Sequence, residues 1–250
     1  MEKEFRKNTI SAIILLGGGY DDESLKKKCF DSVKWCDEVI KVETDKLKGS
    51  FSDWRNEGAK RAKSNWLLYV DADEEVTEDL RKNILQVTDA GEFAGYAIPR
   101  KNIFLGHTMH WGGWSPDFVL RLIRKDKLKG WKGELHEQPV IEGVIGHLKE
   151  SLIHVSHRSL TEMVEKTNNW SEIEAKLLYD SGHPKMNIFR FISAGFREFW
   201  YRAVVKLGFL DGTVGIIEII YQTFSRFVTY SKLWELQMRN SKSQEPNNKQ

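Results

Sequence analysis

Carboxylates directly follow an apolar run in the first third of the chain. Residues 66–70 are apolar, and Asp71, Asp73 and Glu74 come next, with one alanine between the two aspartates. Such a run predicts a buried strand, so both aspartates would emerge at its carboxyl end, where open α/β sheets bind ligands. Carboxylate oxygens beside a phosphate suit Mg²⁺ or Mn²⁺, which favours a metal–nucleotide site. The alternative is that Asp73 and Glu74 begin the next helix, with Thr77 as its N-cap.

An arginine falls in the first turn of a second predicted element. We expect a helix over residues 52–63 with Ser52 as its N-cap, which puts Arg55 where the helix dipole disfavours a cation. A residue that is locally unfavourable for the helix often has a functional role. The planar guanidinium group, with several N–H donors, suits a diphosphate. A solvated arginine on an exposed helix face is the alternative.

The elements that would position these residues alternate along the first hundred residues. Strands are expected over residues 9–16, 38–43, 66–70 and 93–99, and helices over residues 23–35, 52–63 and 77–87. This alternation predicts an α/β sheet built from a βαβαβ half. Right-handed crossovers place the ends of the first and third strands together, so the glycines at 17–19 and the aspartates would face one crevice. Three glycines without a nucleotide-binding spacing fit a plain flexible turn equally well.

Composition restricts the class of protein. With 250 residues, 40% hydrophobic and 30% charged, the chain can bury a sizeable core as one domain plus an appendage. A net charge of +2 argues against a general polyanion binder, so we expect no nucleic-acid partner. Cys29 and Cys36 are expected to be buried thiols in a reducing compartment. The basic N-terminus and the short apolar run 10–16 fit a first strand better than an export signal, and no window reads as a membrane-spanning helix.

The chain changes character after residue 158. Residues 159–162 form a capping-box pattern ahead of a mostly polar helix that should end near residue 179. Between residues 185 and 239, eight Lys/Arg accompany four Asp/Glu. Large apolar side chains and one alanine recur there at helical spacing, namely Phe189, Ile192, Phe196, Phe199 and Ala203. A basic, aromatic helix of this kind can lie in a membrane interface. A second amphipathic helix is expected over residues 214–236. The alternative is that both helices pack on the sheet domain or in a dimer, because helices that pack in this way show the same apolar stripe.

Several motifs in a fixed order support a family resemblance that covers residues 8 to about 236. They are residues 39–40 (VI), 51–56 (FSDWRN), 66–74 (WLLYVDADE), 119–125 (VLRLIRK), 131–137 (WKGELHE), 152–157 (LIHVSH), 208–212 (GFLDG) and 232–235 (KLWE). Together they resemble the inverting family 2 glycosyltransferases, and within that family they are similar to lipopolysaccharide core β-1,4-glucosyltransferases. The resemblance implies a GT-A, Rossmann-like mixed sheet flanked by helices, with a C-terminal amphipathic helical appendage. The implied domains are a catalytic domain over 1–158, a membrane-associating helical extension over 159–240 and a disordered tail over 241–250.

The resemblance also implies a donor site that contains a divalent cation, Mg²⁺ or Mn²⁺. Asp73 would bind the ion directly, while Asp71 would contact ribose or a metal-bound water. Arg55 would support the donor diphosphate. The remaining donor-binding residues implied are Leu16, Gly17, Glu43 and Asp45. The chain departs from the family at residues 16–20 (LGGGY), where polar residues are usual, and at residues 42–46 (VETDK), so either Glu43 or Asp45 could take the nucleoside role.

On the acceptor side, inversion requires one base opposite the diphosphate, and Glu137 is the predicted base. The alternative is a surface glutamate paired with a lysine. His136 would orient Glu137 or contact the acceptor, and Trp131 and Arg121 would also bind the acceptor. His154 and His157 lack two further ligands for zinc, so structural histidines are expected.

These observations predict transfer of a hexose from a UDP-sugar to a lipid-linked glycan at the cytoplasmic membrane face. Transfer to polyprenyl phosphate or to a protein is the enzymatic alternative. An inactive nucleotide-sugar-binding or membrane scaffold is the alternative from another class, and the altered glycine region at residues 17–19 favours it. Asp71, Asp73 and Glu137 argue against it.

Overall fold

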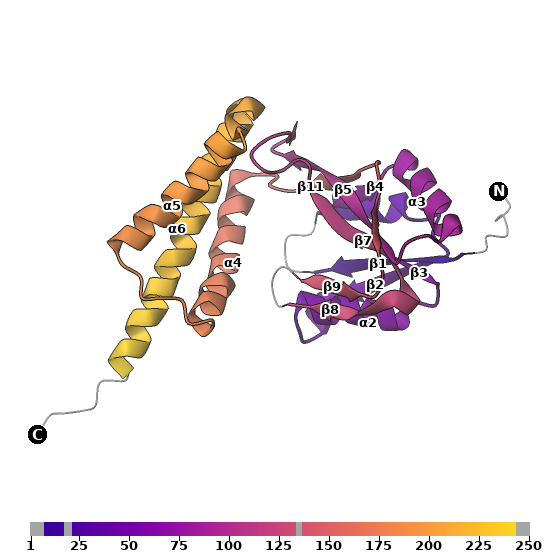
Figure 1. Ribbon diagram of the computed structural model, residues 1–250, viewed down its shortest axis with the longest axis horizontal. Coiled ribbons are helices and arrows are strands. Elements are labelled where there is room, and N and C mark those ends of the chain that lie inside the picture. Colours follow the sequence, from indigo (N-terminus) through magenta and orange to yellow (C-terminus); the bar gives the residue numbers. More distant parts are fainter. Residues whose placement is uncertain (1–7, 18–21, 134–136, 244–250) are drawn as a thin grey trace, which may run out of the picture. The chain divides into compact units, whose positions relative to one another are not determined.

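The computed structural model describes residues 8–17, 22–133 and 137–243, with side chains up to residue 239. The chain separates into two compact units. The sheet unit comprises Met1–Ile103 and Pro116–Ser156, and the helical unit comprises Phe104–Ser115 and His157–Gln250 (Figure 1). Residues 104–115, which we had expected in the catalytic domain, therefore group with the helices.

One mixed sheet forms the centre of the sheet unit. Its strands lie in the order β2-β1-β3-β7-β5-β11-β4, and β10 also pairs with β5. β1 is parallel to β2 and β3, whereas β7 runs antiparallel to both β3 and β5. The bounds are β1 Ile10–Leu16, β2 Glu38–Glu43, β3 Trp66–Asp71, β4 Glu74–Val76, β5 Gly95–Phe104, β7 Phe118–Arg124, β10 Ile145–His147 and β11 Leu152–Val155. The predicted α/β class, a mixed sheet flanked by helices with further helices at the C-terminus, is confirmed.

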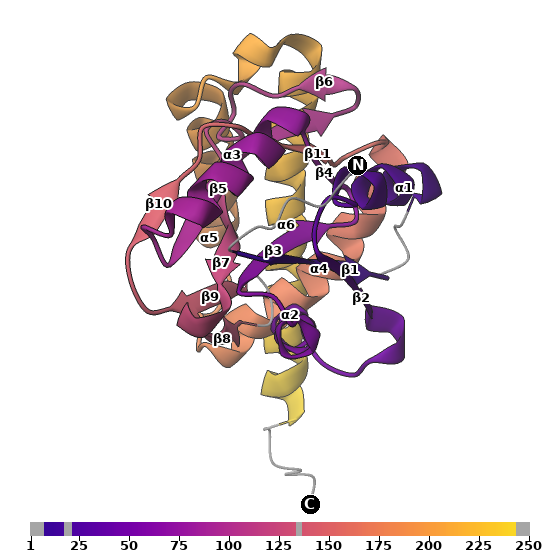
Figure 2. The same cartoon turned by 90° about the vertical axis from the view of Figure 1, so that its right-hand side faces the viewer.

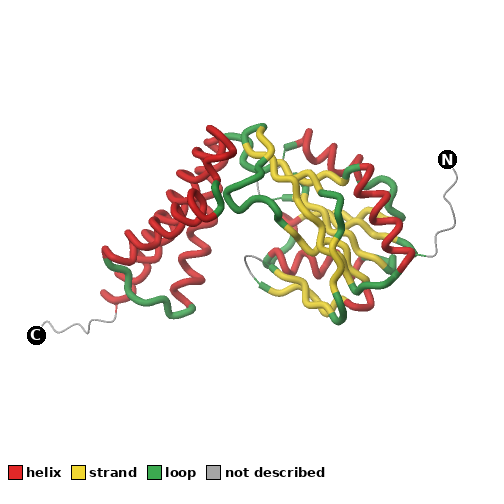
Figure 3. Tube along the Cα trace, turned by 45° about the horizontal axis from the view of Figure 1, so that its top comes forward, coloured by secondary structure: helices red, strands yellow, loops and turns green. Residues whose placement is uncertain are grey.

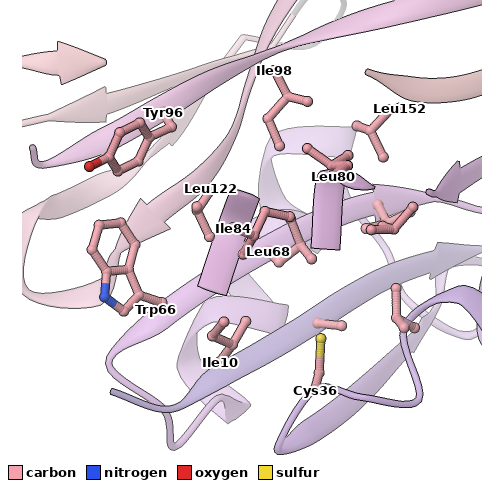
Figure 4. Packing of buried hydrophobic residues seen from close by; sticks show 14 of the residues in the cluster. Ile10, Cys36, Trp66, Leu68, Leu80, Ile84, Tyr96, Ile98, Leu122 and Leu152 are labelled. Carbon is pink, nitrogen blue, oxygen red and sulfur yellow. The ribbon is translucent and has the colours of Figure 1, made fainter. Parts of the chain in front are cut away.

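Helices cover both faces of the sheet. Helices α1 (Glu23–Ser32) and α3 (Glu78–Ala90) cover one face, and α2 (Phe51–Arg61) covers the other together with the hairpin of β8 (Leu128–Lys132) and β9 (Gln138–Ile141) (Figure 2). Side chains of β3 alternate between the two cores, and residues 66–70 are at most 2% exposed. Figure 4 shows Ile10, Trp66, Leu68 and Ile84 in the first of these cores. The apolar run is therefore a strand buried on both faces, as predicted.

The helix starts show where the local sequence was misinterpreted. α2 begins after Ser50, whose side chain accepts a hydrogen bond from the Asp53 backbone N–H while the Asp53 carboxylate accepts one from the Ser50 N–H. Ser52 is therefore not the N-cap, and the prediction was wrong by two residues. Thr77 does cap α3, but Glu74 lies in β4 and not at the start of a helix. Cys29 and Cys36 are buried free thiols, as expected.

The helical unit is built from three long helices. α4 (Leu160–Asp180) starts at the predicted cap Ser159, and α5 (Ile188–Trp200) continues into a π-helical turn over Tyr201–Val205. A 3₁₀ turn over Gly208–Asp211 leads into α6 (Gly212–Ser243), which packs against both α4 and α5 (Figures 1 and 3). The unit also contains the short strand β6 (His107–Thr108). Residues 244–250 of the predicted tail lie outside the described residues. No described helix contains a stretch long and apolar enough to cross a membrane.

Candidate active site

The carboxyl ends of β1, β2 and β3 lie side by side, as the strand pattern predicted. Leu16 is in register with Glu43, and Leu15 is in register with Asp71. Gly17 follows with φ +131°, and a Cβ atom there would lie 2.2 Å from Thr44 Oγ1 and 2.9 Å from Asp45 Oδ1. Gly17 therefore has a specific steric role beside Asp45. Gly18 and Gly19 lie outside the described residues.

Asp71 sits between two arginines at the end of β3. Its Oδ1 accepts a hydrogen bond from Arg55 Nη2 at 2.9 Å, and its Oδ2 pairs with Arg121 Nη2. Burial acts to raise the pKa of Asp71, but the charges and hydrogen bonds of Arg121 and Arg55 outweigh burial and hold that pKa well below its usual range. Both carboxylate oxygens of Asp71 thus pair with arginines of the protein itself, whereas the resemblance implied that Asp71 contacts ribose or a metal-bound water.

Arg55 joins Asp71 to the predicted base. Its Nε donates to Glu137 Oε1 at 2.8 Å, and its guanidinium lies 4.8 Å from the centre of the Trp131 ring. The Arg55 side chain is only 4% exposed. Its remaining nitrogen, Nη1, is buried without a hydrogen-bond partner among the described residues. Arg55 therefore links two carboxylates in the interior, whereas we had expected an open fork for the diphosphate.

Trp131 is itself fixed by helix α2. The Asn56 side chain accepts a hydrogen bond from the Trp131 N–H at 2.8 Å and donates one to the Trp131 carbonyl at 3.1 Å. The Trp131 ring meets Tyr69 edge-on at 4.8 Å, and burial raises the pKa of Tyr69 to about 12, so this hydroxyl stays neutral. Trp131, predicted to bind the acceptor, is 5% exposed, and its ring packs against the Arg55 guanidinium. His136 lies outside the described residues.

A buried acidic residue that the sequence analysis did not assign completes the cluster. Glu74 is 1% exposed, accepts a hydrogen bond from Arg121 Nη2 at 2.9 Å and accepts another from the Asp71 N–H at 3.0 Å. Arg121, predicted to bind the acceptor, is 5% exposed and forms ion pairs with Asp71 and Glu74. Burial alone would lower the pKa of Arg121, but the two carboxylates raise it above its ordinary value.

Asp73 lies on the turn between β3 and β4 and faces a histidine on β11. His154 Nε2 is 3.6 Å from Asp73 Oδ2, and His154 Nδ1 is 2.6 Å from Asn102 Oδ1. Asn102 donates from Nδ2 to the Asp117 carboxylate at 2.9 Å, which fixes the amide so that Oδ1 faces the histidine. His154 Nδ1 must therefore carry a proton. In the neutral ring the Nε2 lone pair then points toward the Asp73 carboxylate.

Two facing acceptors of this kind fit a cation between them. Mg²⁺ and Mn²⁺ are usually held by one or two carboxylates together with substrate phosphates and water, and an imidazole nitrogen as a further ligand suits Mn²⁺ better than Mg²⁺. Within the described ranges, no group of three or more His, Cys, Asp or Glu residues is arranged as a complete protein cage for a metal. His154 was expected to be a structural histidine, because a His-x-x-His spacing after an apolar strand lacks two further ligands for zinc.

The two aspartates should respond differently to substitution. Asp71→Asn removes the charge that compensates two nearly buried guanidinium groups, so we expect a loss of about 3 kcal/mol and a Tm roughly 6–12 °C lower. Because the folded-state pKa is lowered, this stabilisation is present above about pH 4 and is lost as the pH falls further. Thermal unfolding from pH 7 to pH 3 tests both points. Asp73→Asn is the matched control, and an equal loss in that variant would contradict the assignment.

The chain is similar in sequence to proteins that are named glycosyltransferases. No family model matches the chain. It is 23% identical over 192 residues to an uncharacterized glycosyltransferase of Rickettsia conorii, covering 71% of this chain and 67% of that protein. It is 24% identical over 192 residues to an uncharacterized glycosyltransferase of Rickettsia prowazekii, covering 71% and 64%. The chain thus spans about two-thirds of the length of these curated relatives.

Among solved structures, the chain is similar to S. aureus TarS residues 1–349. The TM-score is 0.38 at 12% identity, covering 96% of this chain and 93% of that chain. For the TarS complex with UDP-GlcNAc the TM-score is 0.40 with the same identity and coverage.

Proposed function

We propose that this glycosyltransferase transfers a hexose with inversion from a UDP-sugar to a lipid-linked glycan. The resemblance to lipopolysaccharide core enzymes favours glucose as the sugar and the lipopolysaccharide core as the acceptor. A lipid-linked acceptor would place the protein peripherally at the cytoplasmic face of the membrane. The observation that carries the proposal is the Arg55 bridge, because it ties Glu137 to Asp71 at the strand ends where the donor would bind.

The arrangement assigns a role to each residue. Glu137 is the base: Arg55 holds Oε1, and Oε2, which has no partner among the described residues, can take the proton of the acceptor hydroxyl. Asp71 and Arg55 are positioning residues for Glu137, since both form ion pairs with neighbouring side chains. Gly17, with Glu43 or Asp45, would contact the nucleoside.

Asp73 and His154 would hold Mg²⁺ or Mn²⁺. When bound, such an ion offsets the negative charge that develops on the departing nucleoside diphosphate. Asn102 and Asp117 keep His154 in the tautomer that leaves Nε2 available, and the turn before β4 places Asp73 opposite that nitrogen.

A panel of nucleotide sugars with Mn²⁺ and purified protein tests the proposed class of reaction. We expect slow hydrolysis of one UDP-hexose without acceptor and faster transfer when a lipid-linked glycan is present. Product analysis distinguishes this acceptor from polyprenyl phosphate and from protein. Binding of UDP by calorimetry without turnover of any donor would instead identify a nucleotide-sugar-binding scaffold.

A further inference from the structure

Helix α5 exposes an unusual number of large apolar side chains. Phe189 is 79% exposed, and Ile192 and Phe196 are 60% and 58% exposed. The same helix exposes Ile188, Phe199 and Trp200. Within the helical unit these side chains do not pack into a core, although the residues are of the types that normally form one.

The buried side of α5 holds the helix against α6. Ala194 and Gly195 are buried, and a Cβ atom on Gly195 would lie 2.0 Å from the Phe227 ring. α6 packs against both α4 and α5, so α5 has a helical neighbour on one side (Figure 1). Small residues thus make the helix contact, whereas the large apolar side chains named above stay exposed.

The exposed residues form one continuous arc of the helix. At about 100° per residue, the six apolar residues fall within an arc of roughly 120°, and Arg190 and Arg197 both fall roughly 60–80° beyond the same edge of it. The six are Ile188, Phe189, Ile192, Phe196, Phe199 and Trp200. We call this arc with its two arginines the α5 face.

Charge is distributed unevenly between the helices. Residues 185–206 contain five Lys or Arg and one acid, Glu198. That acid is already paired, with Arg202 at 2.7 Å and Arg226 at 3.6 Å. α4, on the far side of α6, carries five acids and two lysines. The positive charge therefore accompanies the exposed rings, and the negative charge lies with the other outer helix.

We propose that the α5 face binds the interface of an anionic lipid bilayer, with its rings at the level of the acyl chains and Arg190 and Arg197 at the phosphates. An apolar arc with cations along one edge fits a helix that lies in the plane of a membrane. A second copy of the chain is a poorer occupant, because a symmetric contact would bring like charges together. The inference deepens the proposed function, which includes a lipid-linked acceptor.

Flotation of the full-length protein with lipid vesicles tests the proposal without donor or acceptor, so its failure is separable from failure of the proposed reaction. We expect binding to vesicles of phosphatidylcholine with phosphatidylglycerol that weakens as salt rises, and little binding to phosphatidylcholine alone. Phe189→Asp combined with Phe196→Asp should lower binding about a hundredfold. Arg190→Gln combined with Arg197→Gln should remove most of the preference for anionic vesicles.

A matched control comes from α4. Val164 and Ile173 are also exposed, at 51% and 42%, but lie on the acidic helix, so Val164→Asp combined with Ile173→Asp should leave binding unchanged. Circular dichroism and Tm establish that each variant is folded. The proposal is overturned if the intact protein does not float with anionic vesicles at low salt, or if the α4 control loses binding equally. It is also overturned if sedimentation shows a dimer that only the α5 variant dissociates while neither protein binds vesicles.

Discussion

Replacing Glu137 with glutamine is expected to lower kcat for glycosyl transfer about a thousandfold, or roughly 4 kcal/mol of transition-state stabilisation. Glutamine keeps the shape of the side chain, and its carbonyl can still accept the hydrogen bond from Arg55 Nε, but it cannot take the acceptor proton. Donor affinity should therefore be unchanged, which calorimetry with UDP measures. Loss of UDP affinity together with kcat would assign Glu137 to donor binding.

Glu142 provides the matched control for this experiment. It follows the same hairpin, its side chain is 67% exposed, and it pairs with Lys129 at 2.8 Å. Glu142→Gln should leave kcat near the wild-type value. If Glu137→Gln did so as well, another acid would have to be the base, and Glu134, outside the described residues, is the first to test.

Much of the sheet unit was predictable because its signals are local. A run of apolar residues buried on both faces identifies β3, and the alternating elements place the ends of β1, β2 and β3 together. The N-cap of α2 was also recoverable from the sequence: Asp53 stands three residues after Ser50, which is the capping-box spacing, whereas residue 55 after Ser52 is an arginine. Ser50 alone of the two serines therefore has the partner that a capping box requires.

The charged cluster was not predictable in the same way. Arg121 and Glu74 are 47 positions apart, and they meet only because β7 is inserted between β3 and β5 and the chain crosses to the far edge at β4. A sequence shows that an arginine or an acid is present, but it does not show that two arginines share one aspartate. For this reason Arg55 and Arg121 were expected to meet substrate, whereas the structure pairs them with Asp71.

His154 illustrates the same limit for the candidate metal site. Its partners are Asn102 on β5 and Asp73 beside β4, and β11 lies between these two strands. Only the register His154 to Asn102 brings the imidazole to the amide that fixes its tautomer. Asp73 could be identified as a candidate ligand from its position after β3. Identifying His154 as the residue opposite it required knowledge of the order of strands in the sheet.

Asp73→Asn and His154→Asn are each expected to lower transfer at least about a hundredfold, a loss of roughly 3 kcal/mol of transition-state stabilisation. The reason is shared: each substitution removes one of the two side chains that would hold the divalent ion, and the charge on the departing diphosphate is then poorly offset. EDTA should inactivate the wild-type protein, and Mn²⁺ should restore it. Calorimetric titration of Mn²⁺ into the protein with UDP gives a readout independent of turnover, and both variants should weaken that binding.

His147→Asn is the control for the histidine, because His147 is exposed on β10 of the same sheet and makes an edge contact with Phe118. It should retain activity and Mn²⁺ affinity. Full turnover by Asp73→Asn in the presence of chelator would sink the metal hypothesis. If Asp73→Asn lost activity and His154→Asn did not, Asp73 would be the single protein side chain of the two that binds the ion. In that case the proton on His154 Nδ1, held by Asn102, would serve the fold of β11, and the ion would depend on the diphosphate for most of its ligands.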